Sequence, residues 1–399
     1  MSPLLTLFLI VFIDLLGFGI ILPLFPFVAE KYGAAPWLIT FGGAGIYALA
    51  QVIATPIWGR LSDSVGRKPV LMISMLGAVG GHLMLGFSDS LAMLIVARAF
   101  SGLMSGNISA AFAYVADITT PENRAKGLGT VGAAFGLGFM FGPMIGGLLG
   151  GPDAQHLSLL VPALVGAGLS TLAVLGTLFA LPESLKPEHR KPWRGEGSGS
   201  HSPFAAVQGK PVLVGVVVAA LLLATGGAAV QSVLPVWGAD ILDLSPRDVG
   251  WVFFVMGAVG VTVQGGLVGR LVRRYGEKPM LYASLGAHVV GYGVMAFAHN
   301  WTSMWAGTLS FAVGHAIFNT TASSLLSIEA EPRDRGAALG ALQASTAAGR
   351  IVGPASSGAL YDGFGHAAPF LACAALLVPA ALLLSRSHKG DRPHEPVEP

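Results

Sequence analysis

The sequence has 399 residues, of which 53% are hydrophobic and only 11% are charged, with a formal net charge of +2. This composition excludes an ordinary soluble domain, in which about 25% of the residues are charged, and indicates an integral membrane protein. The small net charge argues against nucleic-acid binding, because the basic residues are spread over many short loops. The single cysteine, Cys373, excludes an intramolecular disulfide and a cysteine metal cluster.

Runs of about 20 apolar residues recur along the chain, and each is long enough to cross about 30 Å of hydrocarbon. The first run follows Met1-Ser2-Pro3 without a basic segment, so we expect a retained span and not a signal peptide. The twelve predicted spans lie near residues 4–29, 38–59, 69–87, 91–116, 126–150, 157–181, 211–236, 247–271, 279–298, 302–329, 336–361 and 366–386.

The distribution of basic residues predicts the orientation of these spans. With both termini in the cytoplasm, all but four of the 23 Lys and Arg residues fall on the cytoplasmic side; the exceptions are Lys31 and Arg247 outside and Arg98 and Arg350 within the membrane. The connection 185–210 is rich in Pro, Gly, Ser and charge, which predicts a cytoplasmic linker. We therefore expect two six-helix bundles, at 1–184 and 211–387, and a cytoplasmic tail at 388–399.

A charged turn between two apolar runs occurs twice. The first copy reads Gly59-Arg60-Leu61-Ser62-Asp63-Ser64-Val65-Gly66-Arg67-Lys68-Pro69, and the second runs from Gly269 to Pro279. The charges of the first turn would be too costly at bilayer depth, so it must lie at a membrane surface. Two further groups of residues repeat at an offset of 211. The chain is therefore expected to be a duplication with its substrate site between the halves.

The first turn resembles the loop motif G-x-L-x-D-x-x-G-R-K of the major facilitator superfamily, through Gly59, Asp63, Gly66, Arg67 and Lys68. The resemblance implies a gate in which the Asp63 carboxylate caps a helix and pairs with the other half when the outer side is open. The alternative is a solvated basic loop that only sets topology. The second turn carries Arg273 at the place of the acid, so we expect the two halves to latch unequally.

Asp14 is the only carboxylate that these spans place well inside the bilayer, about 15 Å from the start of the first span. An acid at that depth must be protonated, hydrated or paired. A conformational change that moves it between these settings would load and release a proton, so we expect Asp14 to couple transport to protons. The alternative is a permanently neutral or ion-paired structural acid. The pattern from Asp14 to Pro26 also resembles the first helix of twelve-helix drug/proton antiporters.

Arg98 opens the pattern Arg98-x-x-x-Gly102-x-x-x-Gly106. This pattern resembles the helix 4 motif of the family, whose Arg is linked to proton transfer. A guanidinium stays charged and needs a counter-ion or water. Asp14 is the expected partner, because helices 1 and 4 both face the cavity in this family. The alternative is a structural Arg that binds backbone carbonyls.

The segment Gly138-x-x-x-Gly142-Pro143-x-x-Gly146-Gly147 resembles the motif that marks proton-coupled exporters over importers in this superfamily. Small residues allow close helix contact, while a proline removes a backbone hydrogen bond and bends the helix. We expect this helix to lie at a closely packed, moving interface. The alternative is a tightly packed Gly-rich helix without a role in transport.

Polar residues at helical spacing predict cavity faces more weakly, because each is as readily a helix-helix hydrogen bond. The candidates for the substrate cavity are Tyr47, Gln51, Gln231, His315, Asn319, Gln343 and Arg350. Gln264 and Asn107 are isolated polar residues. No spacing of residues suggests a metal site, a catalytic triad or a phosphate loop, so neither an enzyme nor a cofactor other than the proton gradient is expected.

Over nearly its full length the chain resembles the tetracycline and multidrug proton antiporters, and Leu181-Pro182-Glu183-Ser184 is typical of that group. In the tetracycline branch the ninth helix carries an acid near the position of His288, and no acid replaces it here. This departure argues against metal-tetracycline chemistry and favours an apolar or weakly basic drug or an unidentified metabolite.

The sequence thus predicts an all-α membrane protein of the major facilitator fold, acting as a monomer in the inner or plasma membrane. We expect it to export a small amphipathic or drug-like molecule in exchange for protons by alternating access. Two alternatives stay open: a proton-coupled sugar or organic-acid carrier, and a receptor-like membrane protein that does not transport.

Overall fold

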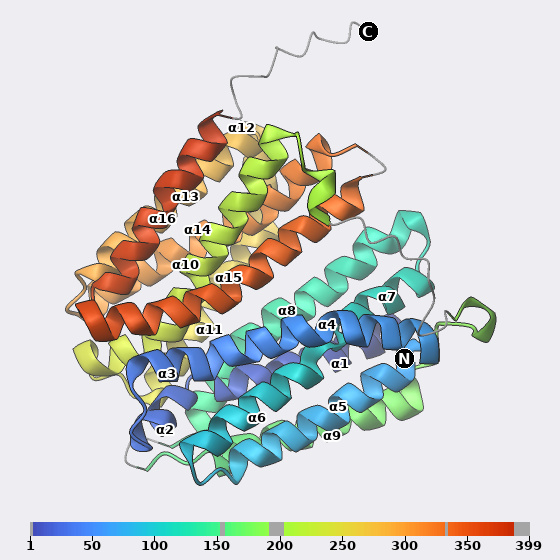
Figure 1. Ribbon diagram of the computed structural model, residues 1–399, viewed down its shortest axis with the longest axis horizontal. Coiled ribbons are helices and arrows are strands. Elements are labelled where there is room, and N and C mark those ends of the chain that lie inside the picture. The colour runs from blue at the N-terminus through green and yellow to red at the C-terminus, as the bar shows by residue number, and fades with distance from the viewer. Residues whose placement is uncertain (1–2, 152–155, 191–202, 332–333, 387–399) are drawn as a thin grey trace, which may run out of the picture.

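The computed structural model describes residues 3–151, 156–190, 203–331 and 334–386. Within these ranges the regular structure is helical and contains no strand. Twelve long rods form two six-helix bundles (Figure 1), which confirms the expected fold. Residues 191–202 of the predicted linker and the whole of the predicted tail 388–399 lie outside the described residues. The exact domain boundaries therefore stay predictions.

Three of the six rods in the N-terminal bundle are interrupted. The first joins α1 (Pro3–Ile21) to α2 (Phe25–Lys31). The second rod contains α3 (Pro36–Thr40), the π-helical turn η1 (Phe41–Gly45) and α4 (Ile46–Val65). The fourth rod contains α6 (Leu91–Met104), the 3-10 turn η2 (Ser105–Asn107) and α7 (Ile108–Ile118). The uninterrupted rods are α5 (Arg67–Gly86), α8 (Pro121–Leu149) and α9 (Leu160–Ala180).

The C-terminal bundle repeats this order of rods. It consists of α10 (Pro211–Leu242), α11 (Pro246–Thr262) with the π-helical turn η5 (Val263–Leu267) and α12 (Val268–Tyr275), α13 (Glu277–Ala296), α14 (Trp301–Glu329), α15 (Arg335–Phe364) and α16 (Ala368–Arg386). Two short 3-10 turns, η3 (Pro187–His189) and η4 (Pro203–Ala206), belong to the connection between the bundles.

Nine of the rods in the described ranges are long and apolar enough to cross a membrane by length and composition. The other three, α13, α14 and α15, are equally long but contain more polar residues. Two of them place polar side chains such as His315 and Arg350 on an internal cavity, where those side chains avoid lipid. The lower hydropathy of these helices therefore comes from polar side chains that face the interior of the protein. It does not place the helices outside the membrane.

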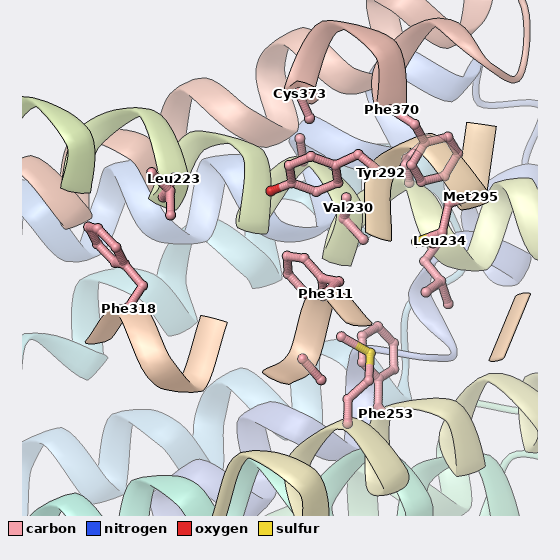
Figure 2. Close-up of a cluster of buried hydrophobic side chains, with 14 of the residues drawn as sticks. Leu223, Val230, Leu234, Phe253, Tyr292, Met295, Phe311, Phe318, Phe370 and Cys373 are labelled. Atoms are coloured by element: carbon pink, nitrogen blue, oxygen red, sulfur yellow. The ribbon is translucent and has the colours of Figure 1, made fainter. Parts of the chain in front are cut away.

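The core of the C-terminal bundle is dominated by large side chains that are fully buried. Figure 2 shows Tyr292 of α13 beside Cys373 and Phe370 of α16, and Phe311 of α14 packs against the other side of the Tyr292 ring with its centre 5.7 Å away. In a membrane such packing cannot rely on the hydrophobic effect, since lipid is equally apolar. Close van der Waals contact between helices is needed instead.

In the part of the chain that the structure describes, the contacts between the two bundles lie toward one end of the molecule. We call the end that bears the Gly66 turn, the Gly276 turn and the linker the basic end, and the opposite end the far end. At the far end the Thr40 hydroxyl donates to the Pro354 carbonyl at 2.8 Å, and a Cβ placed on Gly358 would lie 2.5 Å from the Pro36 carbonyl oxygen. The helices α3 and α15 are thus in backbone contact there.

The second contact between the bundles, of α8 with α11, also ends before the basic end. A Cβ on Gly147 would lie 2.7 Å from the Pro246 carbonyl oxygen, and a Cβ on Gly136 would lie 3.3 Å from Val261. Nearer the basic end, a Cβ on Gly129 or on Gly265 would have no neighbour within 4 Å. The bundles therefore diverge toward the basic end, as the course of α8 and α12 shows (Figure 1).

A larger side chain at Gly358 should prevent the far end from closing, because its Cβ would overlap Thr40 and the backbone of α3. With Cys373 replaced by alanine, we expect Gly358→Leu to lengthen the distance between spin labels at Asp89 and Asp362, two exposed far-end residues of opposite bundles. Gly363→Leu is the matched control on the same helix, since its Cβ meets nothing within 4 Å. Equal distances in both variants would contradict the contact between α3 and α15.

Candidate functional site

Asp14 lies in the middle of α1, about 17 Å from the first residue of that helix. Its carboxylate is partly buried and lies within hydrogen-bonding reach of the Asn107 side chain. Asn107 is part of the 3-10 turn η2, which interrupts the fourth rod at this depth. Asn107 had no predicted role, because a single polar residue carries no spacing signal. The structure makes it the neutral partner of this acid.

Arg98 on α6 is almost completely buried. Its Nε donates to the Gly43 carbonyl at 2.7 Å, and Gly43 belongs to the π-helical turn η1. The guanidinium carbon lies 4.7 Å from the centre of the Tyr47 ring and 5.1 Å from that of Phe18. Such contacts stabilise a cation by about 0.5–2 kcal/mol each, more when it is shielded from water. Arg98 is therefore held by a backbone carbonyl and two aromatic faces.

The expected ion pair between Asp14 and Arg98 is not formed among the described residues. Both side chains instead line one small cavity of about 20 Å³, together with Tyr47, His82 and Ser105. The reason is that the Gly43 carbonyl and the two rings already satisfy the guanidinium. The alternative interpretation, an Arg that binds a backbone carbonyl, describes this conformation. The two charged groups remain neighbours across a space that holds about one water molecule.

The largest internal space with a mixed lining is a central cavity of about 360 Å³ between the bundles. Four of the predicted cavity residues, Gln231, His315, Asn319 and Arg350, line it. Gln264 and Thr346 also reach it, and α8 contributes Phe135 and Phe139 from the other bundle. The sequence missed these aromatic residues, because an aromatic residue in an apolar helix is usually in contact with lipid or core.

A second cavity of about 110 Å³ adjoins the first and shares Phe135, Gln231 and Arg350 with it. Tyr47 and Gln51 line this space, as the sequence predicted. Gln51 also donates to the Ser105 hydroxyl at 3.2 Å, so it joins two helices as well.

Gln343 is exposed and is not among the residues that line these described cavities. It lies two turns from Arg350 toward the basic end, about 10 Å along α15, where the bundles have separated. Its prediction as a cavity residue is wrong for this conformation. The described ranges also contain no group of three His, Cys, Asp or Glu side chains that could hold a metal ion.

The Gly-rich motif of α8 is in contact with two neighbours on two faces. A Cβ on Gly138 would lie 2.5 Å from the Leu15 Cβ, and a Cβ on Gly142 would lie 2.8 Å from the Gly19 Cα, so this face packs on α1 within the same bundle. Gly146 continues the face and meets the Ile20 carbonyl. Gly147 instead faces α11 of the other bundle.

Only part of this motif therefore lies at the interface between bundles. The Gly138, Gly142 and Gly146 face fixes α8 against the helix that carries Asp14, and Pro143 lies inside the helix where the two faces meet. The expected close packing is present in the geometry. Gly147 contacts Pro246 and Gly250 of the other bundle, and movement at this interface stays a prediction.

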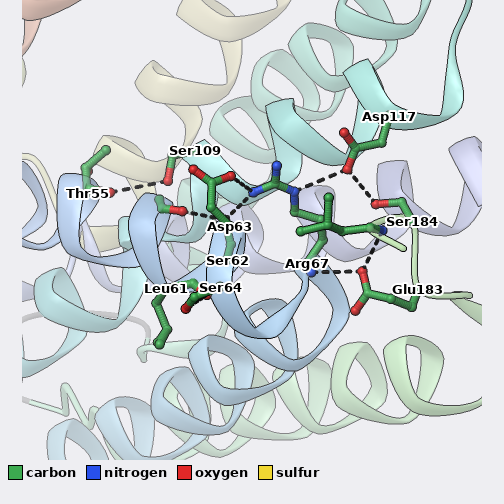
Figure 3. Close-up of polar contacts among 12 residues, drawn as sticks. Thr55, Leu61, Ser62, Asp63, Ser64, Arg67, Ser109, Asp117, Glu183 and Ser184 are labelled. Atoms are coloured by element: carbon green, nitrogen blue, oxygen red, sulfur yellow. Dashed lines mark hydrogen bonds and ion pairs between the residues drawn. The ribbon is translucent and has the colours of Figure 1, made fainter. Parts of the chain in front are cut away.

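The charged turn forms a network centred on Arg67 (Figure 3). Its guanidinium donates to Asp63 at 2.6 Å and to Asp117 at 3.2 Å, and it also donates to the Ser62 hydroxyl at 2.7 Å. The network joins α4, α5 and α7 within the N-terminal bundle. Arg67 is buried and paired, so the interpretation of the turn as a merely solvated basic loop is wrong for this residue.

The cap of the helix that follows this turn is not Asp63 but Glu183. The Glu183 carboxylate accepts hydrogen bonds from the backbone N–H groups of Arg67 and Lys68, at 2.9 and 3.2 Å. Gly66 has φ +117°, and a side chain there would overlap the same carboxylate. An acid at a helix N-terminus is favourable by about 0.3–1 kcal/mol. The start of α5 is thus capped by a residue that begins the connection between the bundles, and the cap expected of Asp63 when the outer side is open stays a prediction.

Asp63 itself is 43% exposed in its side chain and pairs with Arg67 of its own bundle. Among the described residues Asp63 makes no hydrogen bond or ion pair with the C-terminal bundle. In the second turn Arg273 is exposed, at the place of the acid. The role of Asp63 in a gate therefore stays a prediction.

Comparison with known proteins gives one consistent family. The model of the Major Facilitator Superfamily matches residues 7–330 and 265–399. The class C tetracycline resistance protein of Escherichia coli is 29% identical over 351 residues, which cover 88% of this chain and 87% of that protein.

Two solved structures share the fold at lower identity. The crystal structure of the human organic anion transporter MFSD10 (TETRAN) has a TM-score of 0.71 at 24% identity, covering 96% of this chain and 98% of that one. The nucleoside transporter NupG has a TM-score of 0.76 at 17% identity, covering 98% of this chain and 100% of that one.

We expect Gly142→Leu to abolish transport without abolishing membrane insertion, because the new side chain would push α8 away from α1. Overpacking of this kind costs about 1–3 kcal/mol, so substrate flux in vesicles should fall about tenfold or more. Gly129→Leu is the matched control, since it lies on the same helix with no neighbour within 4 Å of its Cβ. Full activity of the Gly142 variant, at equal amounts in the membrane, would show that this contact is not needed.

Proposed function

Because this chain belongs to the Major Facilitator Superfamily, we propose that it exports a small amphipathic molecule in exchange for protons by alternating access. The observation that carries the proposal is the position of Asp14. Its carboxylate lies at mid-helix beside Asn107, and it shares a small cavity with Arg98 and Tyr47 next to the 110 Å³ cavity, whose lining also includes Tyr47. An acid in such a place is the group that can exchange a proton as its surroundings change.

The coupling requires two settings for the same carboxylate. In this conformation Asp14 has a neutral partner, and Arg98 is held by the Gly43 carbonyl. In the proposed cycle Asp14 takes up a proton while the cavity is open to the outer side, and the bundles then rock to the inward-open conformation. There, contact of the carboxylate with water or with Arg98 favours the ionised form and releases the proton to the cytoplasm. Proton binding and substrate binding thus alternate at two adjoining cavities.

The proposed orientation places both termini and the basic end in the cytoplasm, in agreement with the excess of Lys and Arg in the loops at that end. The contact of α3 with α15 then closes the outer side, and the divergence of α8 from α11 opens the central cavity inward. This is the arrangement in which an exporter takes up substrate from the cytoplasm. Closure of the inner side would bring Asp63 toward the C-terminal bundle, where it can act as a latch.

The proposed direction of transport rests on resemblance to known export proteins. The Gly138 to Gly147 motif resembles that of proton-coupled exporters, and curated relatives such as the class C protein are tetracycline resistance proteins. Both support export. We propose a monomer in the inner or plasma membrane that works without a cofactor and without a chemical step.

A second candidate is a proton-coupled carrier of organic acids. It is favoured by Arg350, which lines both larger cavities without an acidic neighbour in either lining. The solved structure of an organic anion transporter with the same fold also fits this candidate. The sign of proton movement separates the two.

Everted vesicles with an acidified lumen and a pH-sensitive dye test both candidates. An exporter that exchanges substrate for protons should raise the lumenal pH when substrate is added outside, across a panel of hydrophobic cations, neutral drugs, organic acids and sugars. A carrier that moves an acid together with protons in the same direction should do so only from vesicles loaded with the acid. A receptor-like protein should cause no change with any of them.

We expect Asp14→Asn to reduce the substrate-driven pH change to that of vesicles without the protein, because an amide cannot exchange a proton. Passive exchange of labelled substrate should persist, since the cavity is intact. Asp362→Asn, at an exposed far-end position, should behave as the parent protein. An Asp14→Asn variant that still accumulates substrate against its gradient at the full rate would overturn the role of Asp14.

A further inference from the structure

Arg350 is the only Asp, Glu, Lys or Arg residue among those that line the 360 Å³ and 110 Å³ cavities. It lies on α15, and more than a third of its surface is exposed, toward these spaces. Within the described residues its guanidinium makes no hydrogen bond and no ion pair, whereas Arg98 is bonded and almost completely buried. The five N–H donors of Arg350 therefore point into a cavity without a protein acceptor.

The charge balance of the region leaves Arg350 without a counter-ion. The linings of the cavities around the site contain two guanidinium groups, on Arg98 and Arg350, and one carboxylate, on Asp14. Asp14 shares its small cavity with Arg98, and Tyr47 lies between that cavity and Arg350. One positive charge remains even when Asp14 is ionised. A cation at membrane depth is costly unless water or an anion compensates it.

The rest of the lining suits a molecule with one anionic group and an apolar body. Gln231 on α10 and Asn319 on α14 supply amide groups on the same cavity as Arg350. Phe135 and Phe139 of α8 form an aromatic wall contributed by the other bundle. A volume of about 360 Å³ lies in the range of pockets that hold drug-sized ligands, about 300–1,000 Å³.

We propose that Arg350 is the substrate anchor and that the substrate is an amphipathic organic anion, with its carboxylate on the guanidinium and its apolar body against Phe135 and Phe139. This inference rests on the proposed function as a transporter and specifies the substrate class of the same site. An apolar or weakly basic substrate, which the sequence favours, would leave the guanidinium without a counter-ion. Arginine and a carboxylate form a paired, charge-assisted contact that lysine reproduces only in part.

The test compares three probes of one shape on the purified full-length protein: 2-naphthoate, its methyl ester and 2-naphthylmethylammonium. We expect naphthoate to bind about tenfold or more tightly than the ester, since a hydrogen-bonded charge is worth that much. The ammonium probe should bind more weakly than the ester. Binding of the ester or the ammonium as tight as that of naphthoate would overturn the proposal without any variant.

Variants then assign the effect to one side chain. Arg350→Gln should lower the affinity for naphthoate to that for the ester and leave the affinity for the ester unchanged, and Arg350→Lys should fall between Arg350→Gln and the parent. Arg270→Gln, at an exposed position of α12, should bind all three probes as the parent does. Naphthoate binding that is unchanged in Arg350→Gln would overturn the proposal. If that variant does not fold, parent-like binding by Arg350→Lys would overturn the paired geometry.

Failure of this inference and failure of the proposed function are distinguishable, because binding is measured without a proton gradient. Naphthoate binding through Arg350 without substrate-driven pH changes in vesicles would leave the anion site intact and remove proton coupling. Proton movement driven only by neutral or cationic molecules would leave proton coupling intact and remove the anion site.

Discussion

The constraint on which this protein depends is the cost of a charge at membrane depth. Three charged side chains, Asp14, Arg98 and Arg350, lie inside the membrane-spanning part, and each is accommodated differently. Arg98 is satisfied by a backbone carbonyl and two aromatic faces, and Asp14 is adjacent to an amide. Arg350 has no such partner among the described residues and is accommodated only by the cavity that it lines. Two of the interrupted rods contribute to this accommodation, since η1 contains the carbonyl that binds Arg98 and η2 contains Asn107.

Close contact between helices positions these charges. Because lipid is as apolar as a leucine side chain, helix association in a membrane relies on shape, and the Gly residues of α8 bring its backbone against α1. The helix that carries the acid is therefore fixed to the helix that contacts α11 of the other bundle. A shift at the interface between the bundles can therefore be transmitted through α8 to α1, which carries Asp14. Gly147 contacts α11 of the other bundle, whereas Gly142 packs on α1 within its own bundle.

The two ends of the molecule differ in their contacts. At the far end the bundles meet through backbone contact between α3 and α15 and through small residues of α8 and α11. At the basic end the charged contacts described above lie within one bundle, with Arg67 buried between Asp63 and Asp117 and Glu183 capping the start of α5. These contacts at the basic end therefore do not join the bundles.

The sequence by itself determined the membrane class, the rods, the two-bundle fold and the charged residues that could carry chemistry. Apolar length, charge within an apolar run and Gly spacing are local properties of the chain. It also predicted His315, Asn319 and Arg350 as cavity residues from their helical spacing, with Gln231 as an isolated further candidate, and all four line one cavity. Only the tertiary structure decided the partners. Asp14 faces Asn107 and not the guanidinium, Glu183 caps the start of α5, and Gln343 lies outside the cavities. A partner comes from a distant segment, and its identity depends on which helices meet and at which height, which no local pattern records.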